Sequence, residues 1–271
     1  MNTSRIYDAS TGNITLDAEL ERLRYQANMC VEKESGKLTS LGLRDGMSVL
    51  EVASGPGFVT EWLSRLVPNG SITCLEIDPV LVKYAGDNLK NKLPCGCEFV
   101  EGSVMKMDFP DNSFDFAYSR LLFEHLEEPV AAAAEIRRVL RPGGKLVITD
   151  GDFAINLLTD PFVPEGQAMR DKMMKVKGSQ GGNAMIGRRL WKILKGAGFR
   201  NLGIDAFVVH SGEKDLRYFY PQFNPDRVAP FIKPGIVSQE EFNNLRNAVD
   251  NFLNSEDPYF MRILLTIVGE K

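Results

Sequence analysis

The sequence predicts an α/β fold, a Rossmann-like and mainly parallel sheet of seven strands with helices on both faces. Short apolar runs alternate with stretches of helical periodicity. A Gly-x-Gly turn follows the first run, and an acidic residue ends the second. The 271 residues are 44% apolar and 25% charged, which allows one large domain, or one domain with an appended subdomain.

Two helices are expected before the sheet. Apolar residues recur at helical spacing from Leu16 to Val31, and Leu38 and Leu41 continue the pattern. We therefore predict a helical cap over residues 1–42 and a main domain over residues 43–271. The first ten residues lack the apolar core of a signal peptide, and no stretch approaches the roughly 18 apolar residues of a spanning helix. The protein is expected to be soluble and cytoplasmic.

The strands are expected in seven apolar runs, namely residues 48–53, 71–77, 98–100, 114–118, 145–149, 199–209 and 262–268. Between them, Ala132, Ile136 and Val139 mark one face of a helix that Arg-Pro-Gly-Gly at 141–144 ends. A further helix ends at Gly198. This alternation implies a parallel sheet with right-handed crossovers and a ligand crevice at the carboxyl ends of its strands.

Two segments interrupt the alternation and are predicted to be lid insertions, residues 152–186 and residues 213–259. The second contains a helix that Ser238 and Glu241 open as a capping box. Methionines of the first segment and aromatic residues of the second suit a pocket for a hydrophobic substrate. Tyr218 and Tyr220 are the candidate substrate contacts, although core packing explains the aromatic residues equally well.

The turn after the first strand holds Gly55 and Gly57. Glycines there let the backbone approach a ligand, and the N–H groups at the following helix start attract an anion. The alternative interpretation is that the two glycines serve only tight packing of the turn. Glu76 closes the second strand, where doubly wound folds place the carboxylate that accepts the ribose hydroxyls. Thr60 stands where a dinucleotide site prefers a third glycine, which favours adenosine without pyrophosphate over a nicotinamide cofactor.

These segments resemble a known family. VLEVASGPG, CLEIDP, FVEGSVMKMDFPDNSFDFAYSRLLFEHL and RRVLRPGGKLVITD follow the order and spacing of class I S-adenosylmethionine-dependent methyltransferases. The resemblance is strong over about residues 43–150 and continues through GRRLWKILKGAGF. It is closest to the small-molecule branch related to the ubiquinone and menaquinone biosynthesis enzymes.

The resemblance implies S-adenosyl-L-methionine as the cofactor, with contacts that follow from matching positions. The methionine end would meet Tyr25, Gln26, Glu51, Ala53, Gly55 and Gly57. Glu76 would hold the ribose, Ile77 would flank the adenine, Ser103 and Val104 would meet its edge, and Ser119 would lie beside the sulfonium. The family usually has Asp where Glu51 and Ser103 stand, so Ser103 or the backbone would recognise the adenine amino group here.

Methyl transfer is an in-line displacement, so the main work of the enzyme is to position the acceptor and exclude water. A phenol, hydroxyl or protonated amine must also lose a proton, and His125, after the fourth strand, is the first candidate base. A structural hydrogen bond is the other reading of His125. Asp150 is a second catalytic candidate and Asp152 a substrate contact, because both follow the fifth strand on the ligand side; alternatively they cap the next helix.

The balance of charged residues indicates which class of substrate the protein binds. Thirty-two Lys and Arg against 36 Asp and Glu give a net charge of −4, which offers no general surface for phosphates and argues against nucleic acid. We expect methylation at oxygen, nitrogen or carbon of a small, hydrophobic or aromatic metabolite. The alternatives are an RNA or protein methyltransferase and a noncatalytic S-adenosylmethionine-binding protein. The four cysteines read as reduced thiols without a metal, and no motif indicates an oligomeric state.

Overall fold

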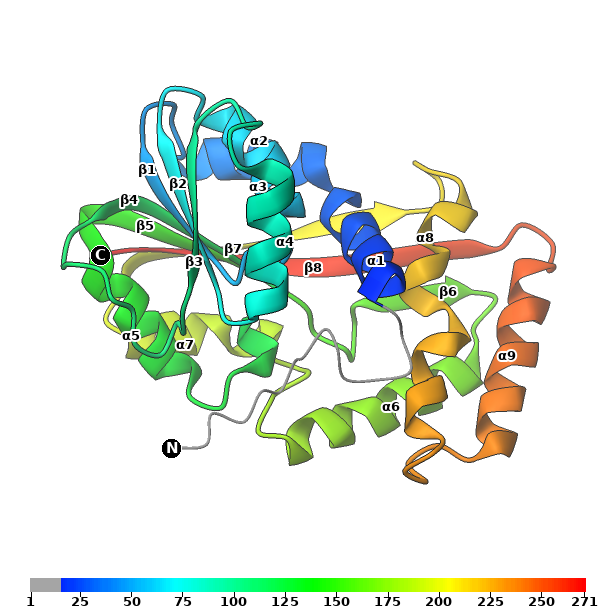
Figure 1. The fold of residues 1–271 in the computed structure, drawn as a ribbon. Helices are drawn as coiled ribbons and strands as arrows, with labels where there is room; N and C mark the ends of the chain where they lie inside the picture. The colour runs from blue at the N-terminus through cyan, green and yellow to red at the C-terminus, as the bar shows by residue number, and fades with distance from the viewer. Residues whose placement is uncertain (1–15) are drawn as a thin grey trace.

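The computed structural model describes residues 16–271 (Figure 1). Its helices are α1 (Leu16–Asn28), α2 (Val31–Leu41), α3 (Phe58–Leu63), α4 (Pro79–Leu89), α5 (Pro129–Val139), α6 (Pro164–Ser179), α7 (Leu190–Gly196), α8 (Leu216–Phe223) and α9 (Gln239–Leu253). Its strands are β1 (Ser48–Val52), β2 (Ser71–Glu76), β3 (Gly96–Glu101), β4 (Phe114–Arg120), β5 (Leu140–Asp150), β6 (Leu157–Asp160), β7 (Arg200–His210) and β8 (Tyr259–Glu270). Short 3-10 helices include η2 (Phe123–His125) and η4 (Pro225–Phe231).

All eight strands join one sheet in the order β3-β2-β1-β4-β5-β8-β6, with β7 also paired to β8. Strands β1 to β5 run parallel to one another, and β8 is antiparallel to β5, β6 and β7. The predicted α/β class with a mainly parallel sheet is confirmed. The predicted count of seven strands is wrong, because the four-residue strand β6 lies inside the segment that we expected to be a lid.

The two faces of the sheet carry different helices (Figure 1). On β4, Phe116 and Tyr118 pack in a core with Leu38 of α2 and Trp62 of α3. The residue between them, Ala117, faces a second core that contains residues of α5 and α7. This alternation along the strand is what a sheet covered on both faces requires.

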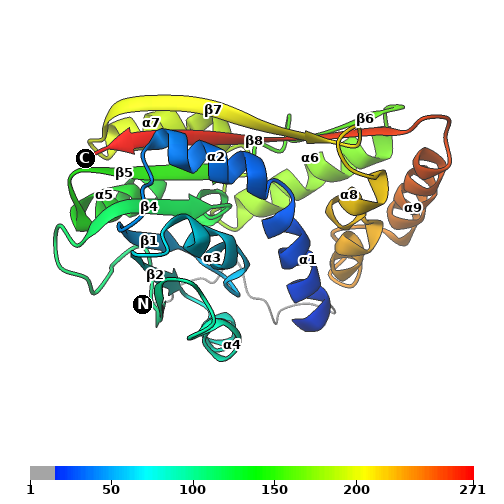
Figure 2. The same ribbon diagram turned by 90° about the horizontal axis from the view of Figure 1, so that it is seen from above.

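Strand β8 runs across the whole molecule, and α8 and α9 lie at one of its ends (Figures 1 and 2). Its first residues pair with β6, and its last residues pair with β5. At the β6 end, Met169 of α6 packs in one cluster with Phe242, Leu245 and Val249 of α9. The two segments expected to be lids therefore lie side by side. The capping box of Ser238 and Glu241 is present at the start of α9.

The expected cap of residues 1–42 is seen here from Leu16 onward, as α1 and α2. Its first fifteen residues, and with them the region examined for a signal peptide, lie outside the described part of the chain. None of the described helices is long and apolar enough to cross a membrane.

Candidate functional site

The turn between β1 and α3 has an unusual backbone. Ala53, Gly55 and Gly57 all have positive φ angles, of 59°, 56° and 84°. A Cβ atom on Gly55 would meet nothing within 4 Å, because this residue faces an open cavity. A Cβ on Gly57 would lie 2.4 Å from Leu89 Cδ1. Gly57, which we expected beside the methionine, does not line the cavity and packs closely against α4.

Glu76 connects this turn to the end of β2. One carboxylate oxygen accepts the Gly55 N–H at 2.8 Å, and the other accepts the N–H groups of Ile77 and Asp78 at 2.8 and 2.9 Å. Burial raises the pKa of the carboxyl, and these three hydrogen bonds oppose that rise. A carboxylate has about four acceptor positions. Glu76 is therefore fixed by the backbone and keeps acceptor capacity on the cavity that it lines.

Glu51, at the end of β1, is a buried carboxyl at the same cavity. Its Oε2 accepts the Thr60 hydroxyl at 2.7 Å and lies 3.9 Å from Cys74 Sγ. Burial raises the pKa of Glu51 to about 8, and the hydrogen bonds from Thr60 and Cys74 moderate the rise. The threonine in place of a third glycine thus has a specific role, which is to bind this carboxyl.

The cavity has a volume of about 790 Å³, and residues from many parts of the chain line it. We call the lining residues up to Met105 the cofactor half and those after Thr159 the acceptor half. The cofactor half contains the candidates Gln26, Glu51, Ala53, Gly55, Glu76, Ile77, Ser103 and Val104. The acceptor half contains apolar side chains such as Met169, Met173, Phe223, Phe231, Leu245 and Val249. His125 lies on the stretch of chain that joins the two halves.

Five further candidates do not line the cavity. Tyr25 and Tyr218 pack edge to face, with ring centroids 5.9 Å apart. The Tyr220 hydroxyl donates to Asn224 Oδ1 at 3.3 Å. Ser119 is fully buried in β4, between two residues that point to the opposite face and reach the cavity. Asp152 is buried and forms an ion pair with Arg188 at 2.5 Å, an arrangement that suits a structural role.

Asp150 does not line the cavity either, but it forms a hydrogen bond with a residue that does. It is fully buried, and its carboxylate accepts the Glu124 N–H at 3.3 Å and the Gly151 N–H at 2.8 Å. Burial and the neighbouring Glu124 raise the pKa of Asp150. Asp150, which we expected to be a catalytic residue, thus contacts the backbone of Glu124 rather than the cavity.

Glu124 lies between Asp150 and the cavity, and sequence reasoning missed it. Its carboxylate is 3.3 Å from His125 Nε2 and 3.0 Å from Lys177 Nζ of α6. Burial alone would raise the pKa of Glu124, but His125 and Lys177 outweigh it and hold the pKa below its usual range. The adjacent His125 could have indicated Glu124. Lys177 carries no motif, because only folding brings α6 to η2.

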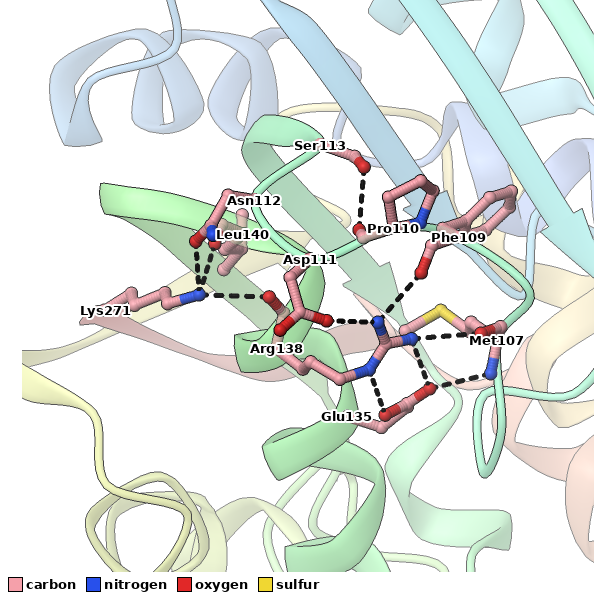
Figure 3. A network of polar contacts seen from close by, with 10 residues as sticks. All are labelled: Met107, Phe109, Pro110, Asp111, Asn112, Ser113, Glu135, Arg138, Leu140 and Lys271. Atoms are coloured by element: carbon pink, nitrogen blue, oxygen red, sulfur yellow. Dashed lines mark hydrogen bonds and ion pairs between the residues drawn. The ribbon is translucent and has the colours of Figure 1, made fainter.

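The loop that follows Ser103 and Val104 is fixed to α5 (Figure 3). The Arg138 guanidinium donates to the carbonyls of Met107 and Phe109 at 3.0 and 2.8 Å, and to Asp111 at 2.7 Å. Glu135 holds the other side of the guanidinium and accepts the Met107 N–H. This network anchors the outer wall of the cofactor half.

Within residues 16–271, no group of three or more His, Cys, Asp or Glu side chains could hold a metal ion. Cys95 and Cys97 are free thiols with their sulfur atoms 3.4 Å apart. The site thus consists of carboxylates, backbone N–H groups, one imidazole and several cations around an apolar cavity.

Known proteins with similar sequences and folds include methyltransferases. Residues 50–148 match the model of a methyltransferase domain. An uncharacterized methyltransferase of Schizosaccharomyces pombe is 34% identical over 110 residues, which are 38% of this chain and 40% of the relative. A ubiquinone/menaquinone biosynthesis C-methyltransferase of Shewanella halifaxensis is 33% identical over 115 residues, 42% of this chain and 46% of the relative. The match thus spans less than half the length of these curated relatives.

A phosphoethanolamine N-methyltransferase of Haemonchus contortus, solved with phosphomonomethylethanolamine and S-adenosylhomocysteine, has a similar fold. The superposition covers 100% of this chain and 61% of the other, with a TM-score of 0.59 and 15% identity. At that identity, the likeness concerns the fold alone. The domain match and the curated relatives identify residues 50–148 as a methyltransferase domain, and this domain resembles the ubiquinone/menaquinone biosynthesis C-methyltransferases.

Proposed function

We propose that this protein transfers a methyl group from S-adenosylmethionine to a small organic acceptor held inside the cavity. The observation that carries the proposal is that one cavity of about 790 Å³ is lined both by the cofactor half and by the apolar acceptor half. Ligand sites usually have volumes of about 300 to 1,000 Å³. The space therefore suits two small molecules bound side by side.

The cofactor half fits the proposed cofactor. Glu76 keeps about one acceptor position for a ribose hydroxyl, and Glu51 offers a buried carboxyl for an ammonium group. The open space at Gly55 leaves room for the methionine part. When bound, the cofactor supplies an electrophilic methyl group on a sulfonium. The chain's own work is to hold both partners in line and to exclude water.

The acceptor half favours a small molecule over RNA or protein. Its apolar side chains come from α6, α8, η4 and α9, which pack together beside the cavity. A macromolecular substrate needs an open face for its reacting group, and RNA also needs a basic one. The methyl-transfer experiment described below identifies the acceptor and the atom that is methylated.

His125 is the proposed base for an acceptor that must lose a proton. It lines the cavity on the stretch of chain between the two halves, and the Glu124 carboxylate lies 3.3 Å from its Nε2. A carboxylate there orients the imidazole and stabilises the cation that forms when it takes a proton. Glu124 is itself held by Lys177 and by the contact of its N–H with Asp150.

The test is methyl transfer from isotopically labelled S-adenosylmethionine to fractionated metabolite extracts. We expect one labelled small-molecule product with the wild type. Glu76→Ala should lose about 1 to 3 kcal/mol of S-adenosylhomocysteine binding, the usual loss for a hydrogen bond to a charged group. His125→Ala should lower turnover and leave that binding unchanged. Label on RNA or protein would contradict the small-molecule proposal, and cofactor binding without any transfer would favour a noncatalytic binder.

A further inference from the structure

Three arginines of the acceptor half have no carboxylate within ion-pair distance among the described residues. They are Arg170 of α6, Arg227 of η4 and Arg262 of β8, and all three line the cavity. The other cations of the lining have carboxylate partners: Arg22 pairs with Glu19, Arg120 with Glu34 and Lys177 with Glu124. Positive charge is therefore left over on one side of the cavity.

Arg227 and Arg262 come from distant parts of the chain and meet at Gln222. The Arg262 guanidinium donates to the Gln222 side-chain oxygen. The Arg227 guanidinium donates to the Gln222 main-chain oxygen at 2.9 Å. Both acceptors are neutral, so they satisfy one N–H group on each arginine without balancing either charge. Each guanidinium has five N–H groups, and most of them are left for another partner.

Burial makes this arrangement costly for the empty protein. Arg262 is 7% exposed and Gln222 is 6% exposed. Arg227 is an exposed residue that lines the same cavity, so Arg262 is the buried member of the pair. Burial and the nearby Arg120 lower the pKa of Arg262 to about 10, and the nearby Arg22 and Arg262 also lower the pKa of Arg227. Both side chains are still cationic at neutral pH.

Gln222 adds an independent sign of a missing ligand. Its Nε2 is buried, and within the described chain it has no hydrogen-bond partner. Buried amide donors are almost always paired, since leaving one unpaired costs about 1 to 3 kcal/mol. Two guanidinium groups and one amide donor around the same residue form a set of donors only. Their complement is an anion with several oxygen atoms.

We propose that the methyl acceptor carries an anionic group, a carboxylate or a phosphate, which binds to Arg227, Arg262 and the amide of Gln222. The rest of the acceptor lies against the apolar side chains of the same half, such as Met169, Phe231 and Leu245. The acceptor is thus an amphipathic acid and not a neutral hydrophobic metabolite. That the bound anion is the methyl acceptor depends on the proposed function, whereas the anion site itself is inferred from these residues alone.

The experiment compares three ligands with the same alkyl chain, namely octanoate, octyl phosphate and octanamide. Binding to the full chain is measured by calorimetry, with and without saturating S-adenosylhomocysteine. We expect the wild type to bind at least one of the two anions about 10- to 100-fold more tightly than the amide, the range for charge-assisted hydrogen bonds. The anion that binds more tightly shows whether the site prefers a carboxylate or a phosphate.

Arg227→Gln and Arg262→Gln should each abolish most of this preference. Arg65→Gln removes the same charge at an exposed position outside the cavity lining and should keep the preference. Arg227→Gln should also melt no lower than the unliganded wild type, because it removes an unbalanced cation. Should Arg262→Gln not fold, Arg262→Lys keeps the charge without the paired N–H geometry and should weaken the preference in part.

Equal binding of the amide and both anions by the wild type would overturn the proposal, as would an unchanged preference in a folded Arg227→Gln. Neither result would affect methyl transfer as such. Conversely, a chain that binds the anions but fails to bind S-adenosylhomocysteine would contradict the proposed function and leave the anion site in place.

Discussion

Gly55 and Gly57 stand two positions apart in the same turn, and different physical constraints act on them. Both have left-handed backbone angles, which cost a non-glycine residue about 1 to 2 kcal/mol. At Gly55 an added Cβ would enter the cavity, whereas at Gly57 it would collide with Leu89 Cδ1 at 2.4 Å. The first glycine therefore serves the ligand, and the second serves the contact between the turn and α4.

Alanine at each position separates these two effects. Gly55→Ala should weaken S-adenosylhomocysteine binding with a modest loss of stability. Gly57→Ala should lower the free energy of unfolding further, since it adds the Leu89 contact to the same backbone cost. Chemical denaturation and calorimetry on both variants measure the difference. A Gly57→Ala protein as stable as Gly55→Ala would show that α4 adapts to the added methyl group.

Glu51 predicts a pH dependence of cofactor binding. Because its pKa is raised to about 8, it is mostly protonated at pH 7 in the free protein. An ammonium group has to displace that proton to form an ion pair. S-adenosylhomocysteine binding should therefore release close to one proton at pH 7, and affinity should rise about tenfold from pH 6 to pH 7. Above about pH 8 the rise should stop, since Glu51 is then ionised and the ligand's amino group loses its own charge.

Calorimetry in two buffers of different ionisation enthalpy counts the released protons. Glu51→Gln is the matched control, which keeps the shape and a hydrogen-bonding partner for Thr60 but has no proton to release. Binding by the wild type without proton release would place the ammonium away from Glu51.

Among the elements, the loop of residues 102–113 owes its position to one side chain of α5. Arg138 binds two of the loop's carbonyls and Asp111, and Lys271 holds Asn112 at 2.9 Å (Figure 3). Ser103 and Val104 at the start of the loop line the cavity. Val104 and Met107 also pack in the apolar core, so the hydrogen bonds of Arg138 act together with this packing to keep one loop conformation.

Arg138→Met should lower the free energy of unfolding by about 1 to 3 kcal/mol, because carbonyls of the loop lose their donors. It should also weaken S-adenosylhomocysteine binding several-fold, although Arg138 does not line the cavity. Arg141→Met is the control, since Arg141 forms one exposed ion pair with Asp115, a contact usually worth about 0 to 1 kcal/mol. If both variants bound equally well, the loop would not depend on the Arg138 network.

The sequence predicted those elements whose signals are local. The β1 turn, Glu76 at the end of β2 and the capping box of α9 each depend on neighbouring residues, and the structure has all three. Strand β6 has no such signal, because its pairing with β8 joins residues 100 positions apart. The ion pair of Asp152 has no local signal either. The strand-end rule places it near a ligand, but Arg188 pairs with it after folding.

At the scale of the whole molecule, β8 links the two halves of the site. One end of the strand lies in the central sheet beside β5, and the other carries Arg262 into the acceptor half. The arginines of that half escaped prediction because no motif relates residues 170, 227 and 262. The net charge of −4 gives no sign of the local excess of cations in the acceptor half.

This layout predicts that the two halves respond to different ligands. S-adenosylhomocysteine should slow amide hydrogen exchange in the β1 turn, at the end of β2 and in residues 102–113, and should leave α6 and α9 unchanged. Those helices are held by their own apolar cluster rather than by the cofactor half, so only a ligand that touches them raises their local opening free energy. Adding the acceptor identified by methyl transfer should then protect residues 164–179 and 239–253. Protection of α6 and α9 by S-adenosylhomocysteine alone would contradict this expectation and show that the sheet, through β8 or the Lys177–Glu124 contact, couples the halves before the acceptor binds.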